Sequence, residues 1–380
     1  MKMEKIALFL PSLNTYYLSI FSSLKKEFER RGIEVNGWPC LLEEEELVEF
    51  CRQFKPDCIL EVNRTRNQIP WLPKDIKHIS WMFDVGEWKY DSLGGSQIIY
   101  FFGANWIKNF QSLGNENIKW LPPAMCGIDY QFGINKKVAD FSFVGHIPNP
   151  WNRSDLSRNI DTDNQSVTFD DIMTKCQSLW AKIDLKGFDN QEYFNSAMRI
   201  VYELTGKNIS ITDKKIRYDF SCRIIRQMNR KNLINLVLKY SKSLRIYGTT
   251  TWENYEKFTE FYIKYLNSPI DLKGVFQSTK INLHEGVGLH DRVFSIMGSG
   301  GFLFYRESPD DNDYGGINTV FEPFVHYIPF NEETFGELSD QYLGNVGERD
   351  EISIKSSLLV HKEHTWFNRV SKIISDINEL

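Results

Sequence analysis

Short apolar runs alternate with stretches of helical periodicity along the first third of the chain. Ile6–Leu10 is an apolar run that ends at Pro11, and this pattern predicts a buried strand. Between Tyr17 and Phe28 the apolar residues recur every three or four positions, which predicts a helix that ends near Gly32. Further helices are expected at EEEELVEFCRQF and NWIKNFQSL, and further strands at CILEV, HISWMF, QIIYFF and IKWLPP. Strands that alternate with helices predict a parallel sheet covered on both faces.

A second alternating series begins at Asp140–Ile147 and is interrupted by a polar, largely helical segment of about 153–239. It resumes with LRIYGTTTW, KINLHEG, DRVFSIMGSGG, FLFY and HYIPF. We therefore predict an α/β protein with two facing, Rossmann-like, doubly wound domains, a helical insertion and a C-terminal helical tail. Ligands of open α/β sheets bind outside the carboxyl ends of the strands, so the loops after FSFV, RIY and INL are the place to look for function.

The expected domain boundaries follow from these two series. Residues 1–135 form the first domain, and 136–355 form the second, with an insertion at about 153–239. We expect a last helix at 356–380, which could pack back on the first domain. The chain of 380 residues is long enough for two separate cores.

Composition and charge exclude several classes of protein. The net charge of -5 shows no basic footprint, so we do not expect a nucleic-acid partner. The apolar stretch in MKMEKIALFLPSLN is too short for a signal peptide, and no run reaches the length of a membrane span. These features predict a cytoplasmic location. The six cysteines have no metal-binding spacing, which predicts reduced and mostly buried thiols.

The stretch Glu285–Gly301, EGVGLHDRVFSIMGSGG, joins a predicted strand to a predicted helix. Its first glycines allow the backbone to approach a ligand, and the helix start near His290 favours an anion. Arg292 adds a guanidinium group that can hold phosphate oxygens in a bidentate manner. This combination indicates a diphosphate site, although such a turn is about as often only a tight connection. Glycines after two other strands, Gly145 and Gly248, favour the binding interpretation.

Taken together, these segments resemble the CgeB-like (spore-protein-type) glycosyltransferases, a branch of the GT-B-fold nucleotide-sugar transferases. The similar segments of the second half are FSFVGHIPNPWNR, LRIYGTTTW, KINLH, GLHDRVFSIMGSGGFLF and HKEHTWFNRV. In the first half, HISWMFD and WLPPAM are similar to the family's strand and interdomain link. The resemblance covers most of the chain outside the segment of about 153–239.

The resemblance implies transfer of a sugar from a nucleoside-diphosphate sugar to an acceptor hydroxyl of a protein, glycan or small molecule. It implies a hexosyltransferase-like enzyme that uses no metal or other cofactor, with the donor in the second domain and the acceptor in the first. The implied donor-binding residues are Gly145, His146, Tyr247, Gly248, Trp252, His284, Gly288, Leu289, His290, Arg292 and Ser295. The expected catalytic residues are Asp84, His290 and Arg292.

Ser295 departs from the family pattern. The family carries a glutamate after Arg-x-Phe, which is expected to hold the ribose hydroxyls, and serine gives up that charge-assisted hydrogen bond. Ser295 therefore keeps one alternative open, a catalytically inactive nucleotide-sugar-binding protein of the same fold. A second alternative, independent of Ser295, is a sugar-nucleotide epimerase of similar fold.

Two further interpretations concern charged residues. Asp84, at the end of SWMFD, is the first candidate for a catalytic base, with Glu87 and Glu285 behind it, although an aspartate at a strand end more often caps a turn. The basic stretch 217–239 is interpreted as an exposed helical face. Its basic residues include Arg223, Arg226, Arg230 and Lys231.

Overall fold

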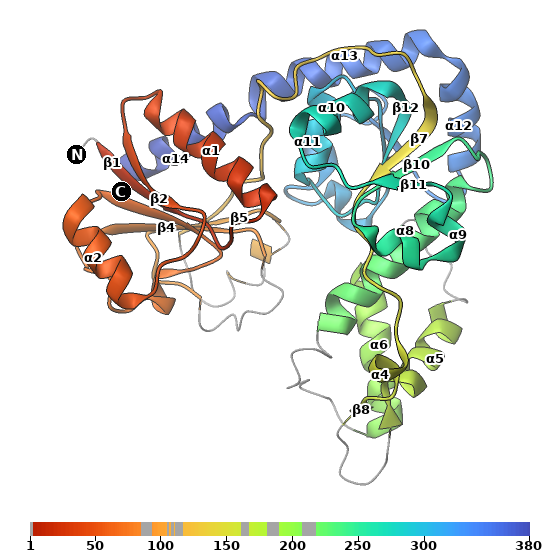
Figure 1. Cartoon of the computed structure of the whole chain (residues 1–380), viewed down its shortest axis with the longest axis horizontal. Helices are drawn as coiled ribbons and strands as arrows, with labels where there is room; N and C mark the ends of the chain where they lie inside the picture. Colours follow the sequence, from red (N-terminus) through yellow and green to blue (C-terminus); the bar gives the residue numbers. More distant parts are fainter. Residues whose placement is uncertain are drawn as a thin grey trace.

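The computed structural model describes residues 3–84, 93–104, 106–107, 110, 117–160, 167–180, 190–206 and 218–380. Figure 1 shows two α/β lobes and a helical arm that extends from the second lobe. We call them the N-lobe, the C-lobe and the arm. Each lobe is built on a six-stranded sheet whose described strand pairs are all parallel, so the predicted two-sheet α/β fold class is confirmed.

The N-lobe sheet has the strand order β2-β1-β3-β4-β5-β6. Its strands are β1 (Lys5–Phe9), β2 (Glu34–Trp38), β3 (Cys58–Val62), β4 (Lys77–Met82), β5 (Ile98–Phe101) and β6 (Ile118–Trp120). The helices α1 (Thr15–Glu29) and α2 (Glu44–Phe54) and the short 3₁₀ helix η1 (Arg66–Gln68) connect the first strands. Every residue of β3 is buried, as expected for a central parallel strand covered on both faces.

The C-lobe sheet has the order β11-β10-β7-β12-β13-β14. Its strands are β7 (Ala139–Val144), β10 (Leu244–Tyr247), β11 (Tyr262–Lys264), β12 (Thr279–His284), β13 (Leu303–Arg306) and β14 (Ile328–Phe330). Its α-helices are α8 (Ile224–Val237), α9 (Glu256–Thr259), α10 (Pro269–Ser278), α11 (Asp291–Gly298), α12 (Phe335–Gly344) and α13 (Val346–Glu363). Its 3₁₀ helices are η4 (Thr250–Asn254), η5 (Pro309–Asn312) and η6 (Ile317–Thr319).

The interval expected as an insertion, about 153–239, contains two different parts. The arm comprises α4 (Arg153–Leu156), the antiparallel pair β8 (Asn159–Ile160) and β9 (Val167–Thr168), α5 (Phe169–Trp180), α6 (Asn190–Thr205) and the π-helix η3 (Asp219–Arg223). It has a hydrophobic core of its own around Phe169 and Phe220. By contrast, α8 buries Leu233, Ile234 and Val237 in the core of the C-lobe. Figure 1 shows this helix at the base of the arm.

The last helix, α14 (Trp366–Asn378), leaves the C-lobe and packs on the N-lobe. Its apolar face enters the N-lobe core, where the ring centroids of Trp366 and Trp81 lie 6.0 Å apart. The buried carboxylate of Asp376 accepts hydrogen bonds of 2.6 Å from both the Tyr100 hydroxyl and Lys119 Nζ. Both chain ends therefore lie at the N-lobe (Figure 1). Among the described helices, none combines the length and apolar character needed to span a bilayer.

A substitution in α14 tests whether this helix is part of the N-lobe core. We expect Ile373→Ala to lower the free energy of unfolding by about 2–5 kcal/mol, because it leaves a cavity among fully buried neighbours. Urea denaturation measures this difference. Ser375→Ala on the exposed side of the same helix is the control, and its effect should stay within about 0.5 kcal/mol. Equal effects of the two substitutions would contradict the packing described here.

Candidate functional site

Three strand ends of the C-lobe meet at one edge of the sheet. Gly145 follows β7 and Gly248 follows β10, and the Gly145 N–H donates to the Tyr247 carbonyl at 2.8 Å. A Cβ atom on Gly248 would lie 2.2 Å from the Gly145 carbonyl oxygen, so this approach requires a glycine. The indole Nε1 of Trp252 donates to that same carbonyl at 2.7 Å. The backbone after β7 is therefore held from two sides.

A buried carboxylate follows the third strand, β12. Glu285 is 1% exposed, and its Oε1 accepts hydrogen bonds of 2.7 Å from both Arg230 Nη2 and Arg292 Nη2. The second amino group of each arginine donates to a backbone carbonyl near the end of β7: Arg230 to His146, two residues after the strand, and Arg292 to Val144, the last residue of the strand. One carboxylate thus joins α8, α11 and the loop after β7.

The charges of this cluster are strongly coupled. Burial alone would raise the pKa of the Glu285 carboxyl, but the charges of Arg292 and Arg230 outweigh burial and hold that pKa well below its usual range. Burial lowers the pKa of Arg230 to about 10, against the opposing effect of Glu285. At neutral pH the cluster therefore holds one negative and two positive groups, and a single positive charge is left over.

Three buried polar atoms of this cluster have no hydrogen-bond partner within the described part of the chain: Arg230 Nε, His284 Nε2 and Glu285 Oε2. The Nδ1 atom of His284 accepts the Gly286 N–H at 3.3 Å, so the proton of the neutral ring sits on Nε2. Burial lowers the pKa of His284 to about 3, which keeps the ring neutral. Unpartnered buried polar atoms are rare in folded proteins, and several around one loop indicate a place for a ligand or ordered water.

The loop from Glu285 to His290 has the backbone geometry that its glycines predict. Gly286 and Gly288 have φ values of 75° and 80°, in the left-handed region. The Gly288 N–H donates to the Tyr305 hydroxyl at 2.8 Å, and the Tyr305 ring stacks on the His284 ring with centroids 5.0 Å apart. His290 is the N-cap of α11, and its Nδ1 accepts from the Arg292 N–H at 3.4 Å.

The N-lobe contacts this loop through aromatic side chains. The Phe102 ring, after β5, meets the His290 ring edge to face with centroids 5.8 Å apart. Phe102 also contacts Phe83, which follows β4, at 5.7 Å between centroids, and Phe83 contacts Tyr17 of α1 at 6.3 Å. The carboxyl ends of strands in both lobes are therefore connected through His290.

Asp84 lies at this N-lobe edge and is exposed. Its backbone N–H and that of Phe83 donate to Asn63 Oδ1 at 3.0 and 2.7 Å, and Asn63 Nδ2 donates to the Tyr17 hydroxyl at 3.3 Å. Asn63 has a φ of 61°, a conformation that asparagine tolerates better than most residues. The neighbouring candidate Glu87 lies outside the described residues.

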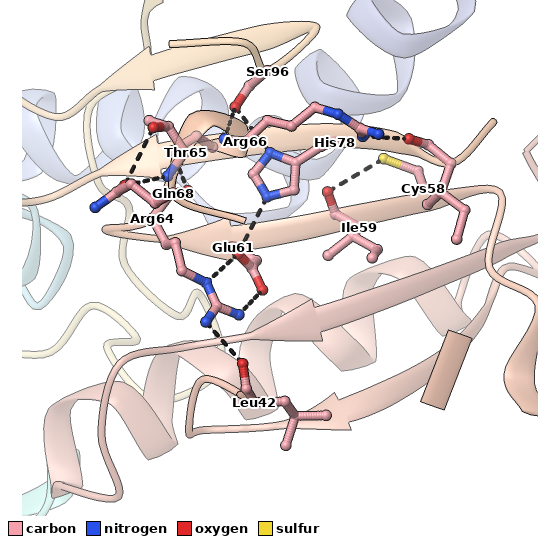
Figure 2. A network of polar contacts seen from close by, with 12 residues as sticks. Leu42, Cys58, Ile59, Glu61, Arg64, Thr65, Arg66, Gln68, His78 and Ser96 are labelled. Carbon is pink, nitrogen blue, oxygen red and sulfur yellow. Dashed lines mark hydrogen bonds and ion pairs between the residues drawn. The ribbon is translucent and has the colours of Figure 1, made fainter. Parts of the chain in front are cut away.

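A buried polar network around Glu61, Arg64 and His78 fixes the turn after β3 (Figure 2). Arg64 donates to both oxygens of Glu61, from Nε at 2.7 Å and from Nη2 at 2.5 Å. The His78 ring lies between Glu61 Oε2 at 3.2 Å and Ser96 Oγ at 2.9 Å. With Glu61 and His78 fully buried, the turn that carries Asn63 is rigidly anchored in the N-lobe.

The structure brings most of the predicted donor-binding residues to one place, but in different roles. Gly145, His146, Gly288, His290 and Arg292 are partly or fully accessible. Tyr247, Gly248, His284, Leu289 and Ser295 are buried beneath them. Desolvation, followed by the charges of Arg230, Arg226 and Arg292, lowers the pKa of His146 to about 3.

Trp252 and Ser295 differ from the expectation. The Trp252 ring is fully buried against Phe143, with centroids 6.0 Å apart, so it supports Gly145 and presents no face to a sugar. Ser295 is 6% exposed and lies near Tyr130 of the segment between the lobes. The position where the CgeB-like family carries glutamate is therefore buried in this structure.

Arg230 is the main residue that the sequence interpretation missed. The prediction that it lies on an exposed helical face is wrong, because its side chain is buried and paired with Glu285. Arg230, Leu233, Ile234 and Val237 have the i, i+3, i+4, i+7 spacing of one helix face. An arginine on an apolar face requires a buried partner, and that pattern was the available signal.

The two lobes and their strand-end loops define the GT-B fold, and comparisons with known proteins agree. A solved structure of sucrose-phosphate synthase from Thermosynechococcus elongatus superposes with a TM-score of 0.53 at 8% identity, over 99% of this chain and 98% of that one. An α-glucosyltransferase solved in complex with UDP and a 13-mer DNA also gives a TM-score of 0.53, at 9% identity, over 98% of this chain and 100% of that one.

Sequence comparison adds a more local result. Residues 221–375, less than half of the chain, match the family described as "Glycosyl transferase-like". This match includes α8, the loop after β12 and α11, and thus every charged residue of the Arg230–Glu285–Arg292 cluster. A search of curated proteins finds no match. Within the described residues, no group of three or more His, Cys, Asp or Glu side chains is placed to hold a metal ion.

Because two arginines share the Glu285 carboxylate, removing its charge should strongly destabilise the protein. We expect Glu285→Gln to lower the free energy of unfolding by about 3–5 kcal/mol, because two buried guanidinium groups lose their counter-charge. Glu351→Gln makes the same change in an exposed pair with Lys355 and should alter it by less than about 1 kcal/mol. Urea unfolding of both variants measures the contrast, and a small effect at Glu285 would contradict a buried, shared charge.

Proposed function

We propose that this protein is a glycosyltransferase that moves a sugar from a nucleoside-diphosphate sugar to an acceptor hydroxyl. The proposal rests on the polar cluster around Glu285, at the carboxyl ends of β7, β10 and β12. Several buried polar atoms of this cluster have no hydrogen-bond partner among the described residues. In open α/β sheets this edge is where ligands bind. The GT-B fold and the local family match support a transferase, and the resemblance to the CgeB-like branch supports a hexosyltransferase-like reaction.

In this proposal the C-lobe holds the donor. The surplus positive charge of Arg230 and Arg292 faces the diphosphate, together with the positive end of the α11 helix dipole. When the sugar–phosphate bond breaks, negative charge accumulates on the departing diphosphate. Fixed guanidinium groups in a partly buried site stabilise that charge without reorganisation, and this chemistry requires no metal.

The N-lobe receives the acceptor. Asp84 and Phe102, which follow β4 and β5, and Tyr17 of α1 lie on the edge that contacts His290. Asp84 and His290 are therefore the two candidates for a base, one from each lobe. The acceptor is a protein, a glycan or a small molecule.

A binding protein without turnover is the second candidate, and one observation favours it. Ser295 is buried against Tyr130 and offers no carboxylate to the ribose hydroxyls. A donor held mainly through its diphosphate would then bind without being turned over. The two candidates differ because an enzyme releases nucleotide from its donor and a binder does not.

The first experiment exposes the purified chain to UDP-, ADP-, GDP- and dTDP-sugars and records thermal stability and free nucleotide together. Hexoses and peptides with serine, threonine or tyrosine serve as acceptors. We expect one donor to stabilise the protein and to release its nucleotide faster when an acceptor is present. Stabilisation without release would favour the binding protein, release of an isomerised donor without an acceptor the epimerase, and no response at all would refute a nucleotide-sugar site.

Arg292 tests where the diphosphate binds. We expect Arg292→Ala to weaken binding of UDP, ADP or GDP, whichever the protein prefers, by about 1.5–3 kcal/mol, because a charged hydrogen bond is lost. Binding of the corresponding nucleoside should change little. Arg52→Ala removes a largely exposed guanidinium group of α2 and is the matched control. Isothermal titration calorimetry measures all four affinities, and unchanged diphosphate affinity would remove Arg292 from the site.

A further inference from the structure

We propose that a second copy of this chain binds along the exposed face of α13, in an antiparallel pairing of the two helices about a two-fold axis. The assignment concerns a surface of the C-lobe and does not depend on sugar transfer. It is carried by a small apolar pocket, by the exposed apolar residues around it and by the order of the charges along the helix.

The apolar pocket lies between α13 and the interlobe segment, residues 122–138. The Ser357 hydroxyl and the His361 Nε2–H both donate to the Gly298 carbonyl, at 2.9 and 3.1 Å, so these polar groups are already used. Pockets for metabolites are usually larger than this one and present polar groups that orient the ligand. A volume of about 230 Å³ with this lining accommodates an aliphatic side chain of a protein. The pocket is lined by Phe132, Ile354, Ser357, Leu358 and His361.

The rim of this pocket is apolar and exposed. Leu358 is 67% exposed, and Ile354 and Phe132 are each 43% exposed. The interlobe segment follows α13 (Figure 1), and its Met125 N–H donates to the His364 carbonyl at the end of that helix, at 3.1 Å. Exposed apolar side chains gathered in one place mark protein interaction sites. The same segment carries three further exposed aliphatic residues: Ile128, Ile134 and Val138.

The face of α13 that carries this rim has the spacing of a helix–helix seam. Glu351, Ile354, Leu358 and His361 follow one another in steps of three, four and three residues. In an antiparallel pairing with the two-fold axis at the height of Ser356, Ile354 meets Leu358 of the second copy. Each Leu358 would then enter the pocket of the other chain. A contact of this kind uses the same surface on both chains and closes at two copies.

The charges beside this seam complement themselves in the same direction. Glu348, Glu351, Lys355 and Lys362 follow one flank of the helix in this order. On a second copy that runs in the opposite direction, the lysines lie opposite the carboxylates. Lys355 lies nearest the axis and is paired with Glu351 of its own helix at 2.6 Å, which limits repulsion between the two copies of Lys355. The contact of Lys362 with Glu363 is exposed and therefore weak, so Lys362 can exchange partners.

This order of charges also favours a second copy over a lipid surface. An anionic membrane attracts a run of basic residues, whereas the flank of α13 begins with two carboxylates. Oppositely charged halves on one helix are matched by the same helix in reverse. The occupant that fits both the pocket and the charges is therefore another molecule of this protein.

Pairing along α13 leaves the candidate functional site accessible. The pocket lies beside Gly298 at the end of α11, whereas Arg292 lies at the start of that helix. Figure 1 shows α13 on the opposite side of the C-lobe from the arm. Each subunit of the dimer would therefore keep its own site and an uncovered arm.

Sedimentation velocity of the whole chain over a range of concentrations tests the association. We expect a reversible monomer–dimer equilibrium. Leu358→Glu should raise its dissociation constant by about tenfold or more, because a carboxylate would be buried against Phe132 and Ile354. Ile270→Glu changes an aliphatic residue of α10 that is 71% exposed, and this matched control should leave the equilibrium unchanged. Circular dichroism verifies that both variants are folded.

Cross-linking tests the direction of the pairing. Along the helix axes, the two copies of position 355 would lie about 3 Å apart, and those of position 362 about 18 Å apart. A short bis-maleimide should therefore join Lys355→Cys chains into covalent dimers and leave Lys362→Cys chains unlinked. The unmodified chain has six cysteines of its own and gives the background.

The outcomes decide this inference separately from the proposed function. A chain that stays monomeric at high micromolar concentration would overturn it, as would an undiminished dimer of Leu358→Glu. Equal cross-linking at positions 355 and 362 would reject the antiparallel pairing. A monomer that releases nucleotide from a sugar donor would keep the proposed function, and a dimer that responds to no donor would keep only the pairing.

Discussion

The C-lobe depends on one carboxylate that is shared by two arginines. Glu285 follows β12, and its Oε1 holds Arg230 of α8 and Arg292 of α11 at 2.7 Å each. Because both guanidinium groups also donate to carbonyls at the carboxyl end of β7, a single charge sets the relative position of two strand ends and two helices. Such an arrangement is costly to bury and contributes little net stability. Its effect is geometric, because it fixes two cationic groups at the edge of the sheet where β7 and β12 end.

The contacts around this cluster restrict which residue types fit in the loop after β12. A Cβ on Gly286 would lie 2.2 Å from the Arg306 carbonyl oxygen, and its φ of 75° excludes most side chains. Arg306 in turn donates to Asn229 Oδ1 at 2.8 Å, and Asn229 Nδ2 donates to the Glu285 carbonyl at 2.9 Å. The loop, α8 and β13 thus form one hydrogen-bonded unit. The helix start at His290 is presented to the N-lobe from this rigid base.

Periodicity predicted the central strands of both sheets because their residues are apolar on both faces. It did not predict β2 or β11, which lie at the sheet edges. β2, EVNGW, has one buried residue, Val35, and β11 has none, so neither shows a run that periodicity detects. The glycines after β7, β10 and β12 follow strands that the sequence predicted, and these strands end at the same edge of the sheet. The polar cluster at this edge also includes Arg230 of α8, which lies 55 residues from its partner Glu285 in the sequence. Local sequence patterns do not reveal a pairing over that separation.

The buried serine at position 295 and the arginine cluster together affect how the proposed donor would be held. Ser295 is buried, and the charge at the site comes from Arg230, Arg292 and Glu285 at the sheet edge, and from Asp291 at the start of α11. In the proposed function, recognition would fall mainly on the diphosphate, which every nucleoside-diphosphate sugar shares. Discrimination between nucleotides would then arise from neutral contacts, which distinguish ligands by shape more than by charge. Such a site would keep the electrostatic stabilisation of bond cleavage and would hold the ribose less tightly.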